Sequence, residues 1–197
     1  MKRYFPVLEY VNLPNIITTL GLLFVVAACY FMTEDNLRYT LICLFFAISM
    51  DVIDGVAASK LNRQTQFGRY LDTLVDSFVC CIIPVLLAFT FVERSILLSI
   101  VLAFYCICGL WRLARFNVIA VEKRPYFTGL PVPGAAMFAL LSVWSVVHYN
   151  LPVWLCGAVF FLSGLLMVSA IKMKKYGIAQ KASWVVGLIF LVVIVIS

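Results

Sequence analysis

Long runs of apolar residues fill most of this 197-residue chain. An α-helix needs about 20 such residues to cross roughly 30 Å of membrane hydrocarbon. Hydrophobic residues make up 64% of the sequence and charged residues 12%, which leaves no stretch for a separate soluble domain. Backbone polar groups must be bonded internally in lipid, and helices do this. We therefore predict an all-α, polytopic helical bundle of six to eight transmembrane spans, with seven as the best estimate.

The runs all belong to a single predicted integral-membrane domain, residues 1–197. Residues 4–14 mix aromatic, aliphatic and polar groups, which predicts an N-terminal segment lying in the membrane interface. No small-residue cleavage site follows the first run, so a removable signal peptide is not expected. The predicted spans are Ile16–Met32, Tyr39–Ala58, Tyr70–Val92, Ile96–Val118, Val132–His148, Val153–Ile171 and Ser183–Ile196.

Basic residues indicate how the spans are oriented. With the N-terminus inside, thirteen of the fifteen lysines and arginines face the cytoplasm, and only Arg38 and Arg94 lie outside. The net charge of +6 then lies on one membrane face, where it would attract anionic lipids and nucleotide phosphates. Topology alone explains the asymmetry about as well. We expect membrane lipids and no nucleic acid as partners, in a bacterial or archaeal cytoplasmic membrane.

Four of the nine acidic residues fall within positions 51–76. A carboxylate near hydrocarbon costs several kcal/mol unless it is paired, hydrated or metal-bound. Asp51 and Asp54 are three residues apart on the second span, and Asp72 and Asp76 are four apart on the third, so each pair shares a helix face. The spacing predicts four carboxylates around one or two divalent ions, and oxygen-only ligands suit Mg²⁺, Mn²⁺ or Ca²⁺ rather than zinc or copper. We expect Mg²⁺ or Mn²⁺ as the cofactor. The seven cysteines lie in apolar runs without zinc-site spacing, and we expect free thiols.

Small residues stand at fixed places between these carboxylates. The whole pattern reads Asp51-x2-Asp54-Gly55-x2-Ala58-Ser59-x8-Gly68-x3-Asp72-x3-Asp76. It resembles the signature of the CDP-alcohol phosphatidyltransferase family, matching seven of its eight positions with every spacing intact. Ser59 is the departure, because the family has arginine there, and Lys60 follows it. Residues 112–117 and 127–136 look like the segments that mark the phosphatidylserine synthase branch of this family.

The resemblance implies a transferase that moves the phosphatidyl group of CDP-diacylglycerol onto the hydroxyl of L-serine. It implies metal binding by Asp51, Asp54 and Asp72, with Asp76 as the catalytic base, also near the metal. It further implies a homodimer whose active site faces the cytoplasm. The candidates for CDP-lipid binding are Thr18, Gly55, Ala58, Ser59, Lys60 and Gly68, and those for acceptor or phosphate binding are Arg112, Arg115, Asn117, Gly129 and Pro131.

Several interpretations stay open from the residues alone. Arg112 and Arg115 suit membrane anchoring as well as anion binding, and the glycines suit helix packing as well as substrate approach. The acceptor is serine, glycerol phosphate, an inositol phosphate or ethanolamine. Clustered aspartates also line ion paths, which makes a cation transporter an alternative. Ser59 motivates a third possibility, an inactive relative of the family.

Overall fold

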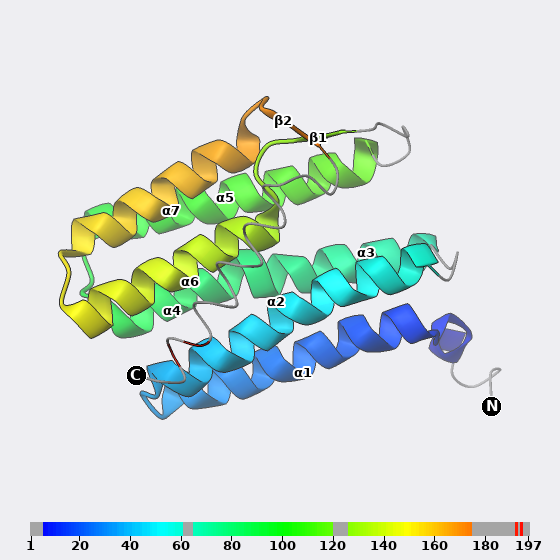
Figure 1. Cartoon of the computed structure of the whole chain (residues 1–197), viewed down its shortest axis with the longest axis horizontal. Helices are drawn as coiled ribbons and strands as arrows, with labels where there is room; N and C mark the ends of the chain where they lie inside the picture. The colour runs from blue at the N-terminus through cyan, green and yellow to red at the C-terminus, as the bar shows by residue number, and fades with distance from the viewer. Residues whose placement is uncertain (1–5, 61–64, 120–125, 175–191, 193, 195–197) are drawn as a thin grey trace.

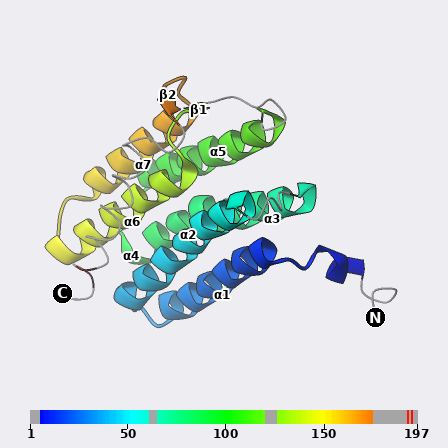
Figure 2. The ribbon, with the colours of Figure 1, turned by 45° about the vertical axis from the view of Figure 1, so that its right-hand side comes forward.

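The computed structural model describes residues 6–60, 65–119, 126–174, 192 and 194. Its helices lie side by side along the long axis of the molecule (Figure 1). Helices α1 and α2 form one side of the bundle, and α5 and α7 form the other, as Figure 2 also shows. The elements are η1 (Pro6–Tyr10), α1 (Leu13–Thr33), α2 (Leu37–Lys60), α3 (Gln66–Asp76), η2 (Ser77–Ile82), α4 (Ile83–Phe91), α5 (Ile96–Ile119), β1 (Tyr126–Thr128), α6 (Val132–Tyr149), α7 (Val153–Val168) and β2 (Lys172–Lys174).

The helices match the predicted spans. Among the described residues, four helices are long and apolar enough to cross a membrane, namely Leu13–Thr33, Gln66–Phe91, Ile96–Val118 and Val132–Tyr149. Helices α2 and α7, with 24 and 16 residues, occupy two further predicted spans. The predicted helical membrane bundle is therefore confirmed. The predicted last span, at 183–196, lies outside the described residues except for 192 and 194.

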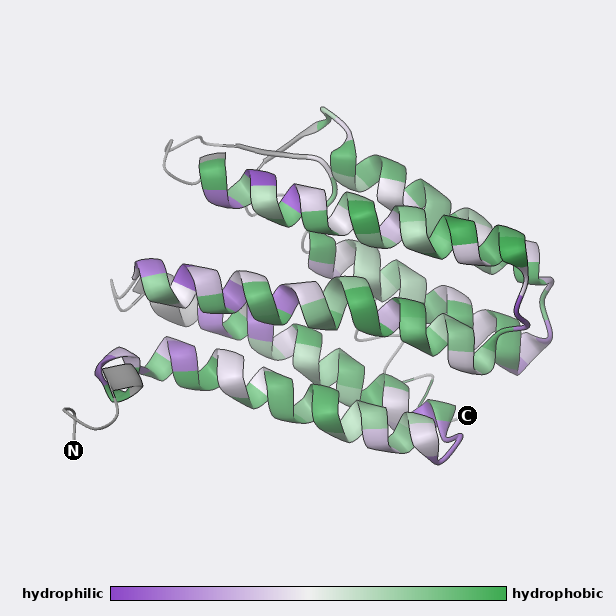
Figure 3. Cartoon of the chain, turned by 180° about the vertical axis from the view of Figure 1, so that it is seen from behind, coloured by the Kyte–Doolittle hydropathy of each residue, from purple (hydrophilic) through white to green (hydrophobic). Residues whose placement is uncertain are grey.

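Apolar side chains cover the outside of the bundle as well as its interior. Figure 3 shows hydrophobic residues around the middle of the helices and hydrophilic ones concentrated toward their ends. Ile96 is 84% exposed and Trp154 is 70% exposed. Water would disfavour such exposure, whereas hydrocarbon would not, so these side chains suit contact with lipid. All seven cysteines are free thiols, as expected.

The N-terminal segment packs against the start of α3. Pro6–Tyr10 forms the short 3₁₀ helix η1, and the Tyr10 ring stacks on Phe67 with centroids 4.3 Å apart. The Asn12 side chain then caps α1 by accepting a hydrogen bond from the Asn15 amide at 2.9 Å. The segment predicted to lie in the interface thus also joins the first helix to the third.

The third predicted span is not one regular helix. A π-helical turn, η2, separates α3 from α4 and begins directly after Asp76. Pro84 has no N–H, so the carbonyl of Cys80 loses the donor that a regular helix would supply. The buried hydroxyl of Tyr105 on α5 donates to this carbonyl at 2.8 Å. Such turns mark functional sites in many helices, and this one adjoins the predicted base.

Replacing Tyr105 by phenylalanine should lower the free energy of unfolding by about 1–3 kcal/mol, because the Cys80 carbonyl would stay buried without a donor. Thermal unfolding of the purified protein in detergent measures the effect. Tyr30→Phe is the matched control, since Tyr30 is 61% exposed. Equal unfolding temperatures for the two variants would contradict the role given to Tyr105.

A two-stranded ribbon departs from the all-α expectation. Strands β1 and β2 pair antiparallel, with Tyr126 opposite Lys174 and Thr128 opposite Lys172. The pairing continues beyond the strands, because the Gly129 amide donates to the Ile171 carbonyl and the Leu130 amide to that of Leu166, both at 2.9 Å. The ribbon ties the segment before α6 to the end of α7. Six residues are too few for the hydrophobic pattern to reveal strands.

Candidate active site

Three aspartates from two neighbouring helices lie close together inside the bundle. Each of Asp51, Asp72 and Asp76 offers a carboxylate oxygen, and these oxygens all lie within 4.8 Å of one another. Asp51 belongs to α2, whereas Asp72 and Asp76 lie one turn apart on α3. Asp76 is buried and the other two are half-buried. The structure thus brings together three of the four predicted carboxylates.

Asp54 lies outside this group of three. Its buried carboxylate accepts a hydrogen bond from the Thr18 hydroxyl of α1, which also lies 3.1 Å from the Pro14 carbonyl. Three residues turn a helix by about 300°, so Asp54 points roughly 60° away from Asp51. On α2 this rotation directs Asp54 toward α1. Direct metal binding by Asp54 stays a prediction, and Thr18 contacts an aspartate of the signature.

The clustered carboxylates suit a divalent cation. Three negatively charged oxygens at this separation repel one another unless a cation lies among them. Mg²⁺ and Mn²⁺ prefer oxygen ligands, whereas zinc and copper favour nitrogen and sulfur. The donor set of Asp51, Asp72 and Asp76 therefore fits the predicted ion.

The surroundings of Asp76 hold its carboxylate in place. The Cys80 thiol lies 3.8 Å from one carboxylate oxygen, and the positive charge of Arg112 on α5 interacts with the same carboxylate. The Arg112 Nε atom is buried and has no hydrogen-bond partner among the described residues. Arg115, three residues after Arg112 on α5, is exposed. Of the two arginines, only Arg112 therefore lies within the site.

The two glycines of the signature have different surroundings. A Cβ atom at Gly55 would meet no atom within 4 Å, so this position borders open space. A Cβ atom at Gly68 would lie 2.8 Å from Oδ1 of Asn15 and 3.1 Å from Oγ1 of Thr65, which caps α3. Gly68 thus allows α3 to approach α1 closely. Ala58, Ser59 and Lys60 belong to the last turn of α2, and their side chains lie outside the described part of the chain.

The glycine and proline predicted near the acceptor have packing roles in the structure. Gly129 is buried with φ at +80°, and a Cβ atom there would overlap the Met167 carbonyl oxygen. Pro131 precedes α6 as its N-cap residue. Neither residue lines the cavity found beside α3. Acceptor binding by Gly129 and Pro131 stays a prediction that no contact among the described residues supports.

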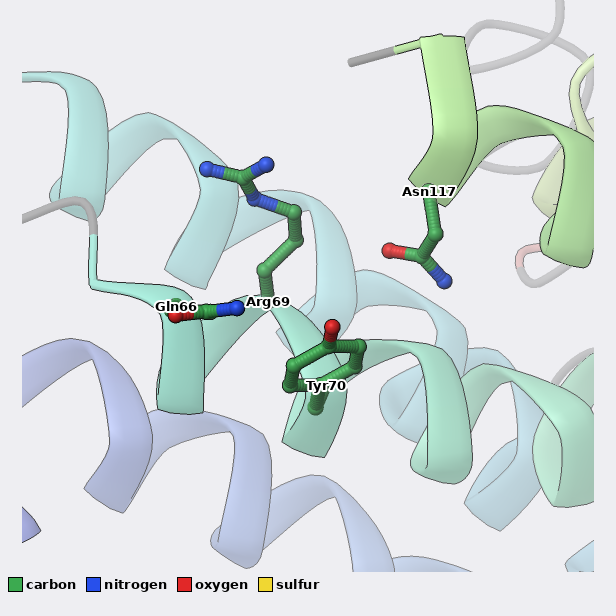
Figure 4. Close-up of a pocket in the computed structure, with 4 residues that line it drawn as sticks. All are labelled: Gln66, Arg69, Tyr70 and Asn117. Carbon is green, nitrogen blue, oxygen red and sulfur yellow. The ribbon is translucent and has the colours of Figure 1, made fainter. Parts of the chain in front are cut away.

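A cavity of about 260 Å³ opens between α3 and α5. Gln66, Arg69, Tyr70 and Asn117 line it (Figure 4). Of these four residues, only Asn117 was singled out from the sequence. Arg69 could have been singled out from the sequence. It precedes Asp72 by three residues and Asp76 by seven, which places it on the same helix face. The Asn117 side chain of α5 contacts Thr73 of α3, and sequence spacing does not reveal a contact between two helices.

Comparison with known proteins assigns most of the chain to a family. The family model for CDP-alcohol phosphatidyltransferases matches residues 11–171. The chain belongs to the CDP-alcohol phosphatidyltransferase family. It is therefore an integral membrane enzyme of phospholipid biosynthesis, and the match favours this reading over the cation-transporter alternative. The predicted last span lies beyond the matched range.

Curated relatives of this CDP-alcohol phosphatidyltransferase share much of its length. A protein of Bacillus subtilis is 30% identical over 166 residues, which cover 83% of this chain and 90% of the relative. A protein of Methanocaldococcus jannaschii is 30% identical over 176 residues, which cover 89% of this chain and 77% of the relative. A protein of Helicobacter pylori is 28% identical over 193 residues, which cover 93% of this chain and 79% of the relative. All three are named CDP-diacylglycerol–serine O-phosphatidyltransferase.

Proposed function

We propose that this chain transfers the phosphatidyl group of CDP-diacylglycerol to the hydroxyl of L-serine, giving phosphatidylserine and CMP. The observation that carries the proposal is the group of three carboxylate oxygens within 4.8 Å, contributed by α2 and α3. The names of the relatives favour serine over the other acceptors. Residues 1–197 act as a single membrane domain, and the resemblance to the family implies a homodimer.

The proposed step exchanges one phosphorus–oxygen bond for another. The serine hydroxyl oxygen bonds to the phosphorus that carries diacylglycerol, the bond from this phosphorus to the bridging diphosphate oxygen breaks, and CMP leaves with that oxygen. Asp76 accepts the hydroxyl proton. A carboxylate has two oxygens, so Asp76 has one for a proton and one for a cation. General-base assistance of this kind contributes typically 10²–10⁴-fold.

A divalent cation completes the proposed site. Asp51, Asp72 and Asp76 would hold Mg²⁺ or Mn²⁺, with Asp54 as the predicted fourth ligand. When bound, the ion screens the diphosphate charge and stabilises the CMP leaving group. The CDP-lipid would lie beside α1 and α2, where Gly55 borders open space and Thr18 holds Asp54. Arg112, whose buried Nε has no partner in the described part of the chain, would bind the lipid phosphate.

The location suits a substrate that is half lipid and half nucleotide. Acyl chains of CDP-diacylglycerol stay in the bilayer, and its nucleotide stays at the surface. Asp51 and Asp54 lie toward the end of α2, and Asp72 and Asp76 lie in the second half of α3. The connection between these helices carries Arg63, with Lys60 just before it and Arg69 shortly after it. Positively charged connections stay in the cytoplasm, so we place the active site on the cytoplasmic side.

Removing divalent cations should reduce CMP release to background, because the diphosphate charge would no longer be screened. The test uses purified protein, CDP-diacylglycerol and labelled serine, before and after EDTA, with Mg²⁺ or Mn²⁺ added back. Parallel reactions replace serine by glycerol phosphate, inositol phosphate or ethanolamine. Release with serine alone supports the proposal. Chelator-resistant turnover would refute the metal, a different acceptor would refute serine, and no turnover with any acceptor would favour an inactive relative.

A further inference from the structure

The cavity between α3 and α5 contains an unsatisfied hydrogen-bond acceptor. Asn117 donates from Nδ2 to Oγ1 of Thr73 at 2.8 Å and to the Leu113 carbonyl at 3.4 Å. Its other terminal atom, Oδ1, is buried and has no partner among the described residues. Buried amide oxygens are nearly always bonded, so an orphaned one beside a cavity indicates a missing donor.

The neighbouring threonine determines which end of the Asn117 amide faces the cavity. The Thr73 hydroxyl donates its single proton to the Arg69 carbonyl at 2.9 Å. It can therefore only accept from Asn117, which must present its NH₂ group to Thr73. The carboxamide oxygen then faces the space between Arg69 and Tyr70, as Figure 4 shows. A ligand in this cavity would meet a fixed acceptor atom.

The same cavity offers a cation. Arg69 lines it and is half-buried, with a long side chain that can follow a small ligand. A guanidinium binds carboxylates, whereas the Asn117 oxygen accepts from an ammonium or hydroxyl group. The cavity is therefore complementary to a small molecule that carries an anionic group and a hydrogen-bond donor. Ethanolamine lacks the anionic group.

The cavity also lies on the side of α3 that an incoming acceptor would occupy. Gly68 of α3 packs against Asn15 of α1, whereas Thr73 contacts Asn117 of α5. The two contacts define opposite neighbours of the helix that carries Asp72 and Asp76. Arg69, which lines the cavity, precedes Asp76 by seven residues, about two helical turns, so both residues share one face of α3. A serine bound by Arg69 would therefore lie on the same side of α3 as the proposed base.

We propose that Arg69 and Asn117 select the acceptor, Arg69 by binding the carboxylate of serine and Asn117 by accepting a hydrogen bond from its ammonium group. This assignment rests on the proposed transfer to serine. It replaces the sequence-based choice of Arg115, Gly129 and Pro131 as acceptor residues. Thr73 is a positioning residue, because it acts only through the Asn117 amide.

The test combines enzyme variants with serine analogues. Arg69→Gln should raise the KM for serine about ten- to a hundredfold, as expected for losing one charged hydrogen bond, and leave the KM for CDP-diacylglycerol within about twofold. Serinol, which lacks the carboxylate, should bind wild type and Arg69→Gln equally well. Asn117→Leu should weaken the binding of serine about tenfold. The same variant should leave the binding of 3-hydroxypropionate, which lacks the ammonium group, unchanged. Analogues that are not turned over are measured as competitive inhibitors.

Arg94→Gln is the matched control, since Arg94 is exposed at the far end of the span that starts at Gln66, and it should behave as wild type. Thr73→Val keeps the Asn117 oxygen and should raise the KM for serine less than Asn117→Leu does. Equal losses for serine and serinol in Arg69→Gln would overturn the assignment, as would a rise confined to the KM for CDP-diacylglycerol. Wild-type enzyme that releases no CMP with serine would instead refute the proposed function.

Discussion

The Asp76→Asn variant should lose turnover by about three orders of magnitude or more while it still binds CDP-diacylglycerol in a metal-dependent way. Asparagine keeps an oxygen for the cation but cannot accept the serine proton. Asp76 is buried, and the neighbouring carboxylates of Asp51 and Asp72 would be engaged by the cation, so neither replaces it readily as a base. CMP release under saturating substrates measures the loss, and binding is followed separately with the CDP-lipid.

A matched control separates loss of the base from loss of an aspartate. Asp35 is exposed beyond α1 and has φ at +53°, a conformation that asparagine also adopts readily. Asp35→Asn should therefore turn over at the wild-type rate. Near-normal turnover by Asp76→Asn would show that the base is elsewhere. Loss of CDP-lipid binding in that variant would assign Asp76 to metal binding alone.

The Gly129→Ala variant should have the largest effect on stability, with a loss of about 3 kcal/mol or more. The residue has φ at +80°, which strains any side chain, and its Cβ atom would overlap the backbone carbonyl of Met167. A backbone atom cannot move aside as a flexible side chain does. The ribbon that joins the start of α6 to the end of α7 would have to shift. Thermal unfolding in detergent measures the change.

Gly134→Ala provides the comparison within the same segment. A Cβ atom at Gly134 would lie 3.9 Å from the nearest atom, Cδ1 of Leu130, which is an ordinary contact. Alanine favours the helix more than glycine does, so this variant should be neutral or slightly more stable. If both variants unfold at the same temperature, the close contact between Gly129 and Met167 is not a constraint on the fold.

The helices could be predicted closely because each apolar run must form its own backbone hydrogen bonds in lipid. Predicted and observed starts coincide at Ile96, Val132 and Val153. The π turn was missed, because it depends on Pro84 in the third span together with the Tyr105 hydroxyl of the next. The ribbon was missed because its strands lie 44 residues apart and are three residues long.

The carboxylate site was predicted in part. Spacing of four residues placed Asp72 and Asp76 on one helix face, and the structure brings them to Asp51. The helical offset of three residues directs Asp54 to Thr18 on α1, a partner that no spacing within α2 can indicate. Acceptor binding by Arg115 and Gly129 stays a prediction; in the structure Arg115 is exposed and Gly129 fills a packing contact, neither of which sequence spacing indicates.

The amino-acid sequence alone determined the membrane bundle, its family and the group of aspartates proposed to carry the chemistry, because these follow from local periodicity and from residue types at fixed spacings. The tertiary structure decided which side chains share a space. Arg69 and Asn117 line one cavity although 48 positions separate them in the chain. Contacts of this kind depend on how helices pack, which is set by many side chains together and leaves no periodic trace in either segment.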